Sequence, residues 1–255
     1  MYDLPTRERA LALVRQGRSL NSVSRETGVS RAAIRSWQQE IRPARPAAAC
    51  PRCAPEPRLP DEPAAYCYLL GLYLGDGCIS RLGRTYSLRI ACADAWPGLI
   101  EECEQALRAV RSGNRTGRVR QQGCVSVWAY SNHWPCLFPQ HGPGRKHERR
   151  IRLEPWQQEA VDAYPWEFIR GLVHSDGCRV ANWTTRVVAG ERKRYEYPRY
   201  FLTNKSEDIL RIYSETLAKV GVESRITRRG GAPYNVSVAR RPSVVLMDAH
   251  VGAKH

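Results

Sequence analysis

The sequence of 255 residues lacks any long apolar run, and this absence excludes one class of protein at once. No stretch approaches the roughly 18–20 apolar residues that a membrane-spanning helix needs, so we do not expect a transmembrane protein. Residues 1–17 carry charges among their apolar positions and have no small-residue cleavage site, so they do not form a secretory signal. The nine cysteines are an odd number and no export signal precedes them, so we expect reduced thiols rather than a disulfide framework.

Lysine is also scarce. Only five of the 40 basic residues are lysine and 35 are arginine, against 25 acidic residues, which gives a net charge of +15. A GC-rich coding sequence would raise the ratio of arginine to lysine but would not explain the net charge. Such a charge favours phosphate backbones or anionic surfaces as partners, and the arginine fork suits phosphates and base edges. We therefore expect a partner that carries phosphate groups or an anionic surface.

Proline marks a boundary near the N-terminus. Seven of the 21 residues from Pro43 to Pro63 are proline, which prevents a continuous helix or a central strand and predicts a semi-rigid linker. We expect four parts: a small domain at 1–42, the linker at 43–63, and two halves of a larger body at 64–160 and 161–255.

The small domain is predicted to be a helix-turn-helix. A first helix follows Pro5 and stops at Gly17, Ser19 caps a short second helix, Gly28 makes the turn, and Ser30 caps a third helix. The turn and the helix lengths resemble those of resolvases and transposases. The third helix would offer four residues to the DNA major groove, Ser30, Arg31, Arg35 and Gln38. A three-helix module for protein interaction is the alternative.

An internal repeat organises the larger body. Residues 68–79 read YLLGLYLGDGCI and residues 168–180 read FIRGLVHSDGCRV, so the two copies align at a spacing of one hundred residues. Alternating strands, a helix and a further pair of strands follow each copy. The pattern predicts an α+β fold built from two α-β-β-α-β-β units.

Helix packing explains the small residues of the repeated motif, and metal binding explains its acids. Gly71 and Gly75 are four apart, as are Gly171 and Ser175, so each pair lies on one face of a helix and allows a second helix to approach closely. Packing along these faces would bring Asp76 and Asp176 to one end of the helix pair. Two adjacent carboxylates are stabilised by a divalent cation, so a Mg²⁺ or Mn²⁺ site for phosphodiester hydrolysis is expected there. Two acids that only cap the following turns are the alternative.

Residues 64–250 resemble the two-motif, monomeric LAGLIDADG homing endonucleases, because residues 69–77 and 169–177 align with the nine positions of that motif. The resemblance implies a pseudo-twofold αββαββα pair whose two sheets form a saddle on DNA. It also implies that Asp76 and Asp176 are the catalytic, metal-binding acids. The earlier acid of the motif is replaced by Leu74 and His174, and we expect His174 to be a helix-face residue rather than a ligand.

A basic residue assists the catalytic site near the last strand of each half in this family. In the first half Ser131 and Asn132 stand there, and in the second half Arg240 or Arg241 is the candidate. Arginines on the predicted strands are the candidates for DNA contact, and they are Arg81, Arg84, Arg89, Arg118, Arg120, Arg186, Arg192, Arg194, Arg225, Arg228 and Arg229.

Two further segments have chemistry of their own. Residues 141–150, HGPGRKHERR, form either a loop that grips phosphate or a flexible connection between the halves. Cys50 and Cys53 form half of a possible Zn²⁺ site, with Cys67, Cys136 or a histidine of 141–147 as further ligands, and free thiols are the alternative. The cysteines at 78, 92, 103, 124 and 178 are expected to be small core residues.

The sequence and the resemblance thus predict a site-specific, Mg²⁺-dependent endonuclease that cuts double-stranded DNA and works as a monomer. We expect a cytoplasmic protein associated with a bacterial nucleoid. A catalytically silent DNA-binding transcription regulator on the same scaffold is the main alternative. A role in RNA splicing also fits the scaffold.

Overall fold

The computed structural model describes residues 3–40, 60 and 62–255. Three helices form the N-terminal unit: α1 (Leu4–Arg15), α2 (Leu20–Thr27) and α3 (Arg31–Glu40). Ser19 accepts a hydrogen bond from the amide of Ser22 at the start of α2, and Gly28 ends the helix with a φ of 70° that favours glycine. Buried apolar residues from all three helices and the turn form a core, namely Ala10, Val23, Val29 and Ile34. The predicted helices and turn are present.

The larger body repeats one order of elements. The first half comprises α4 (Pro63–Asp76), β1 (Gly77–Leu82), β2 (Thr85–Ala93), α5 (Pro97–Val110), β3 (Thr116–Gln121), β4 (Cys124–Tyr130) and α6 (Trp134–Leu137). The 3-10 helix η2 (Lys146–Glu148) and α7 (Pro155–Ala163) connect the halves. The second half comprises α8 (Pro165–Asp176), β5 (Gly177–Val188), β6 (Glu191–Thr203), α9 (Glu207–Lys219), β7 (Arg225–Arg229), β8 (Ala232–Val238) and α10 (Arg241–His250).

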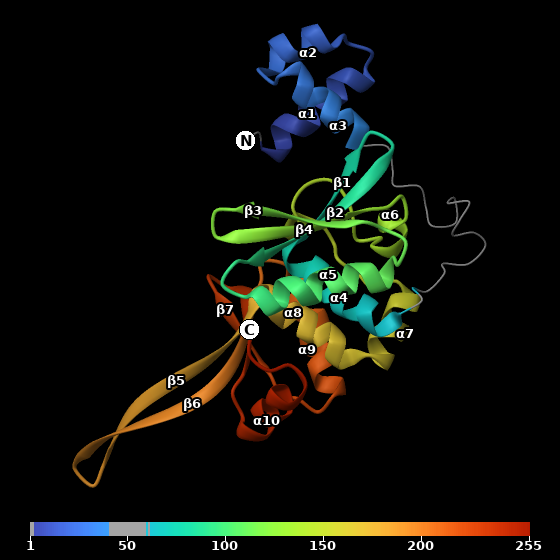
Figure 1. The fold of residues 1–255 in the computed structure, drawn as a ribbon. Helices are drawn as coiled ribbons and strands as arrows, with labels where there is room; N and C mark the ends of the chain where they lie inside the picture. The colour runs from blue at the N-terminus through green and yellow to red at the C-terminus, as the bar shows by residue number, and fades with distance from the viewer. Residues whose placement is uncertain (1–2, 41–59, 61) are drawn as a thin grey trace.

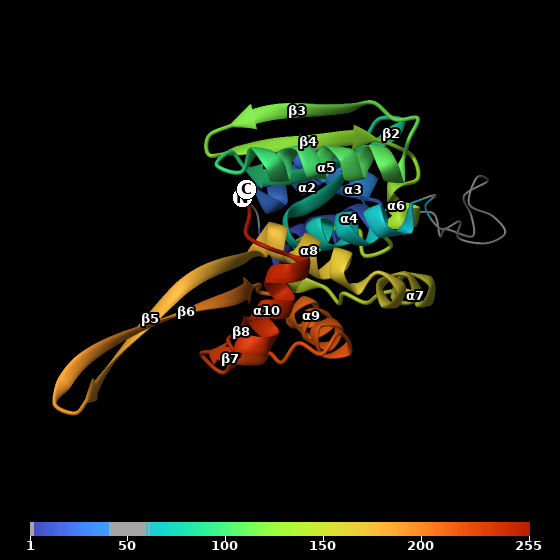
Figure 2. The same ribbon diagram turned by 60° about the horizontal axis from the view of Figure 1, so that its bottom comes forward.

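Each half folds into a four-stranded antiparallel sheet with the same strand order. The orders are β1-β2-β4-β3 and β5-β6-β8-β7. Helix α5 lies against the first sheet and α9 against the second, with α4 and α8 between them (Figures 1 and 2). The predicted α+β duplication is therefore confirmed.

The two motif helices form the centre of the body. Nine consecutive residues of α4, from Tyr66 to Leu74, are buried, which is why this helix is apolar on all sides rather than amphipathic. The buried residues of α8 run from Phe168 to His174 with one half-buried position between them. A single core joins both helices to both sheets.

The two halves differ most in their first hairpin. β1 and β2 have 6 and 9 residues, whereas β5 and β6 have 12 and 13. Pairing in this hairpin continues out to Val188 and Glu191, so it projects beyond the rest of the body (Figures 1 and 2). Turn residues Ala189 and Gly190 both have positive φ, as a tight hairpin turn requires.

None of the helices in the described ranges is long and apolar enough to cross a membrane. The boundaries of the four predicted parts remain predictions. Most of the linker, with Cys50 and Cys53, lies outside the described residues.

Candidate functional site

Close contact between α4 and α8 depends on two glycines. A Cβ atom on Gly171 would lie 2.1 Å from the carbonyl oxygen of Tyr68, and one on Gly71 would lie 2.6 Å from the backbone nitrogen of Leu172. Real Cβ atoms do not approach other atoms so closely, so the helix backbones are in direct contact at this crossing. The small residues picked out in the sequence thus lie in the contact between the two helices.

The same crossing brings the two acids to one end of the helix pair. A Cβ atom on Gly75 would lie 3.2 Å from Oδ2 of Asp176, and 2.1 Å from the hydroxyl oxygen of Ser175. Asp76, the next residue along the chain, is the last residue of α4, as Asp176 is of α8. We call this shared end of α4 and α8, with Asp76 and Asp176, the carboxylate pole.

The glycines after the acids allow the chain to pass from each helix into a strand. Gly77 and Gly177 adopt extended backbone conformations, with φ of −86° and −96°, rather than a left-handed helix cap. A Cβ atom on Gly77 would lie 2.5 Å from Cα of Tyr73, and one on Gly177 would lie 2.6 Å from Cα of Val173. The chain can leave each helix directly into a strand only because these residues lack a side chain.

The surroundings of the two acids raise the pKa of each. Burial and the charge of Asp76 raise the pKa of Asp176 to about 6, against a hydrogen bond of 2.5 Å donated by the Asn204 amide to its Oδ2. The side chain of Asp76 is exposed at the pole, yet partial desolvation of its carboxylate by the surrounding chain raises its pKa as well. Two acids that disfavour each other's ionisation form a place where a cation is stabilised.

Lys146, from η2, lies directly against the carboxylate pole. Its ammonium group donates to the carbonyl oxygens of Tyr73, Gly75 and Gly77, at 2.6 Å for Gly75 and 2.8 Å for Gly77. Burial lowers the pKa of Lys146 to about 8, and the charges of Asp176 and Asp76 oppose that shift. The lysine therefore binds carbonyls at the C-terminal end of α4 and supplies positive charge to the acids.

Lys254 does the same for the other half. Its ammonium group donates to the carbonyl oxygen of Ser175, in the last turn of α8, at 2.9 Å. Burial lowers its pKa, and Asp76 and Asp176 oppose the shift. Each lysine follows the last helix of its own half, α6 or α10, and binds carbonyls of its own motif helix. The two lysines are thus related by the same duplication as the acids.

The two arginines predicted to assist the site have other contacts or are exposed. Arg240 pairs with Glu223 at 2.6 Å just before α10, and Arg241 is exposed at the first residue of that helix. Lys146 lies in the segment 141–150, for which a phosphate-gripping loop or a flexible connection was predicted, but neither this lysine nor Lys254 was predicted to lie at the acids, because each is far from its helix in sequence. One signal was available: they are two of only five lysines in the chain.

The donor set at the carboxylate pole suits a hard divalent cation. Carboxylate oxygens are the ligands that Mg²⁺ prefers, usually one or two of them with water and phosphate oxygens completing the shell. Within the described ranges no group of three or more histidine, cysteine or acidic residues could hold a metal. A cation at Asp76 and Asp176 would therefore take its other ligands from water, carbonyl groups or a bound phosphate.

An open pocket of about 370 Å³ adjoins the pole on the side of Asp176. Its lining residues include Lys146, Lys205, Asn204 and Tyr234. Two ammonium groups beside a carboxylate make this pocket suitable for a phosphate group rather than for an apolar ligand.

His174, which replaces the earlier acid of the motif, is buried. Its Nδ1 is hydrogen-bonded to the hydroxyl group of Tyr68 at 2.9 Å, and burial lowers its pKa to about 3. It is therefore a neutral, buried residue of α8 that is hydrogen-bonded to Tyr68 of α4.

The first sheet turns most of its candidate arginines away from its open face. Directly opposed residues of antiparallel strands point to the same side, and Arg118 and Arg120 share their side with the buried Val127 and Val125. Arg118 also donates to Glu104 of α5 at 2.7 Å. Arg81 lies on that side as well, and Arg84 is in the hairpin turn, so among these five only Arg89 lies on the open face.

The second sheet presents more charge. Arg186 and Arg225 lie on its open face, as do Lys193 and Arg199, which were not among the candidates. Arg192 and Arg194 point to the other side of the projecting hairpin, where Arg194 pairs with Glu196 and lies over the ring of Trp183. Arg228 and Arg229 follow a bulge at the end of β7, and Arg229 lies over Tyr234 of the pocket.

The candidates in the N-terminal unit are all exposed. Ser30, Arg31, Arg35 and Gln38 are open to solvent around α3, and Arg31 donates to Asn21 of α2. Their contact with DNA remains a prediction.

The cysteines divide into two groups. Cys92 and Cys103 are core residues as expected, whereas Cys78 and Cys178 are exposed and Cys124 is half-buried, because they lie on the open faces of the sheets. Cys67 is buried and burial raises the pKa of its thiol to about 12, which disfavours the thiolate that zinc requires. The zinc prediction rests on Cys50 and Cys53, outside the described residues.

Comparison with known proteins agrees with this geometry. Residues 163–245 match the LAGLIDADG-like domain family. A solved structure of a single-residue variant of I-DmoI, in complex with its target DNA in the presence of 2 mM Mg, has a similar fold. The match covers 76% of this chain and 98% of the I-DmoI chain, with 17% sequence identity and a TM-score of 0.50. The body has the duplicated LAGLIDADG-like fold. No curated protein matches the chain.

Two other solved structures are similar at lower scores. I-DmoI in complex with DNA and Mn has 16% identity and a TM-score of 0.49, covering 76% of this chain and 98% of its own. The N-terminal LAGLIDADG domain of DUF199/WhiA has 10% identity and a TM-score of 0.47, covering 83% of this chain and 89% of its own.

Proposed function

We propose that the chain is a site-specific DNA endonuclease that hydrolyses phosphodiester bonds with one acid from each motif. The observation that carries this proposal is the carboxylate pole: two acids from the two copies of one motif meet at one end of α4 and α8, each with a lysine of its own half beside it. Two half-buried ammonium groups at this place support a site for a negatively charged group such as a phosphate.

The roles of the residues follow from their chemistry. Asp76 and Asp176 would hold Mg²⁺ or Mn²⁺, which when bound supplies Lewis acidity at the phosphate and lowers the pKa of a coordinated water. Lys146 and Lys254 add fixed positive charge beside a phosphate that becomes more negative as it is attacked. The pocket beside Asp176 gives the DNA backbone a place next to both groups.

The sheets would provide the contact with double-stranded DNA, and one chain would cover both half-sites as a monomer. Two sheets of the same strand order, related by the duplication, suit a duplex, whose two antiparallel strands are likewise related by twofold symmetry. The complex of the I-DmoI variant with its target DNA supports this use of the fold.

The test is cleavage of a randomised duplex library with Mg²⁺ or Mn²⁺ by the wild-type chain, Asp76→Asn and Asp176→Asn. We expect metal-dependent cutting at a selected sequence and a loss of at least about 100-fold with either substitution. Asp94→Asn, in an exposed turn after β2, is the matched control and should cut normally.

A DNA-binding regulator without cleavage is the second candidate. The N-terminal unit favours it, because α2, the turn at Gly28 and the capped start of α3 have the form of a DNA-binding module. Tight, sequence-specific binding without cutting in any metal, unaffected by either asparagine substitution, would reject the endonuclease and support the regulator.

A further inference from the structure

Residues Lys254 and His255 cross from the second half of the body to the first. The backbone amide of Leu99, in the first turn of α5, donates to the carbonyl oxygen of His255 at 3.2 Å. Amides in the first turn of a helix have no partner within the helix, and α5 has no side-chain cap, so His255 satisfies one of these free donors.

The ring of His255 packs directly against Gly98. A Cβ atom on Gly98 would lie 2.2 Å from Cδ2 and 2.5 Å from Nε2 of His255. Any side chain at position 98 would therefore displace the ring. The glycine adopts an ordinary backbone conformation, so an added Cβ would be opposed by His255, whose ring atoms and backbone oxygen lie within 3.1 Å of it.

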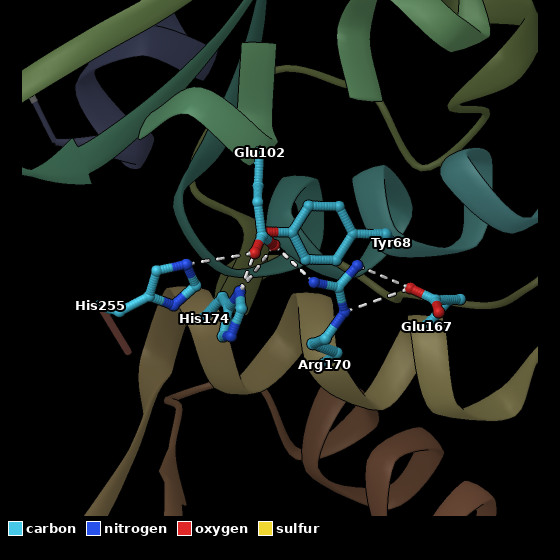
Figure 3. Close-up of polar contacts among 6 residues, drawn as sticks. All are labelled: Tyr68, Glu102, Glu167, Arg170, His174 and His255. Atoms are coloured by element: carbon cyan, nitrogen blue, oxygen red, sulfur yellow. Dashed lines mark hydrogen bonds and ion pairs between the residues drawn. The ribbon is translucent and has the colours of Figure 1, made fainter. Parts of the chain in front are cut away.

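Glu102, one turn further along α5, holds the other side of the ring. Its Oε1 lies 3.6 Å from Nε2 of His255, and its Oε2 lies 2.5 Å from Nη1 of Arg170 on α8 (Figure 3). Arg170 also pairs with Glu167 at 2.9 Å and lies over the ring of Tyr68 on α4. Glu102 is thus fixed by groups from the motif helices, and it presents a carboxylate of fixed position to His255.

We propose that this contact of His255 with Gly98, Leu99 and Glu102 positions Lys254 at the carboxylate pole. The proposal deepens the endonuclease function and rests on it for its catalytic meaning. His255 is anchored on the first half, and the adjacent Lys254 binds the carbonyl oxygen of Ser175 on the second half. The first half therefore fixes a cationic group that serves the acid of the second half.

The physical argument is one of preorganisation. A lysine side chain loses much rotational freedom when it is held in one place, and a backbone that is fixed on only one side of the residue leaves more of that freedom to be lost. Anchoring His255 fixes the backbone next to Lys254, so less freedom remains to be lost when the ammonium group takes its place. His255 is accordingly a positioning residue, not a catalytic one.

Gly98→Ala is the most direct test, because alanine suits a helix and adds only the Cβ that meets His255. We expect chemical acetylation of Lys254, measured by mass spectrometry, to become about five- to tenfold faster in this variant, because the segment of Lys254 and His255 opens locally. Lys146 in the same molecules should keep its slow rate. Gly113→Ala is the matched control, since no atom lies within 4 Å of a Cβ there.

His255→Ala provides the second variant and a test of mechanism. It should expose Lys254 to the same extent, and Gly98→Ala should have almost no further effect in its background, since both changes act on one contact. A full additional effect of Gly98→Ala in that background, or unchanged Lys254 reactivity in either folded variant, would overturn the proposal.

Cleavage assays separate this inference from the proposed function. For an active enzyme, we expect the single-turnover rate to fall about tenfold in Gly98→Ala while the affinity for DNA stays unchanged, because Lys254 acts at the pole and not on the sheets. A wild-type chain that never cuts DNA but shows the predicted change in Lys254 reactivity would reject the endonuclease and keep the positioning role of His255.

Discussion

Lys146 binds three carbonyl groups and also lies beside two acids, so it has both a structural and an electrostatic role. The carbonyls at the C-terminal end of a helix carry partial negative charge, and the acids add to it. Without the ammonium group, this part of the molecule would hold several negative centres with less compensating charge. The same argument applies to Lys254 with its carbonyl contact.

Replacing Lys146 by methionine keeps the length and volume of the side chain and removes its charge. We expect cleavage to slow by about 10- to 100-fold, a loss typical of removing one electrostatic contact in an active site. Single-turnover nicking of a selected duplex measures this effect. Lys219→Met is the control, because that lysine pairs with Asp162 on the surface, and its rate should remain within about twofold of wild type.

His141 predicts how stability depends on pH. Burial and the charge of Arg149 lower its pKa from 6.5 to about 4, so the folded chain keeps this ring neutral while the unfolded chain protonates it below pH 6.5. Its contribution to stability is complete above about pH 6.5 and is lost as the pH falls towards 4. Melting temperatures across this range should fall more steeply for wild type than for His141→Asn; parallel curves would contradict the assignment.

Helices α4 and α8 pack through backbone rather than through interlocking side chains. This explains why the motif tolerates only small residues at one face, and why the acids that follow are brought together so closely. A change at the crossing should therefore affect the fold before it affects the chemistry.

Gly171→Ala tests the crossing directly. Its Cβ would lie 2.1 Å from a backbone oxygen, which cannot move aside as a side chain would, so we expect a loss of about 3 kcal/mol or more in the free energy of unfolding. Urea unfolding measures it. Gly113→Ala should change the free energy by less than about 0.5 kcal/mol, and an equally small change at Gly171 would show that the helices are less close than described.

The projecting hairpin of β5 and β6 makes the two sheets unequal. The open face of the second sheet carries Arg186, Lys193, Arg199 and Arg225, whereas the open face of the first carries Arg89 from the predicted set. If DNA lies across both sheets, the second half provides more phosphate contacts and a longer contact with its half-site.

The double variant Arg186→Gln, Lys193→Gln should therefore weaken DNA binding and reduce its dependence on salt by about two units of slope. Arg118→Gln with Arg120→Gln removes the same amount of charge from the other side of the first sheet. That pair should leave the salt slope unchanged and lower stability instead, since Arg118 is held by Glu104. Equal effects of the two pairs on the slope would contradict the assignment of the faces.

Across the whole molecule, the duplication was the feature most accessible to sequence analysis. Two copies of one motif at a spacing of one hundred residues, followed by the same alternation of strands and helices, were enough to predict the fold. The capping serines and Gly28 likewise predicted the N-terminal helices, because cap and turn chemistry is local.

What escaped prediction depends on contacts between distant segments. Lys146 and Lys254 reach the pole from loops whose path no local pattern specifies, and the sides of the sheet on which Arg118 and Arg120 lie depend on register. The length of the β5–β6 hairpin was missed because its outer residues are exposed on both sides, so they show no alternation of apolar and polar positions.

The proposed function requires that Asp76 and Asp176 form one catalytic site for cutting DNA. Strand-labelled, single-turnover cleavage of a selected duplex with Mg²⁺, by the wild-type chain and by each asparagine variant, tests it most directly. We predict that wild type cuts both strands, that either variant loses cleavage of both by at least about 100-fold, and that DNA affinity stays unchanged. Cleavage that persists in both variants, or specific binding without any cleavage by wild type, would contradict the claim.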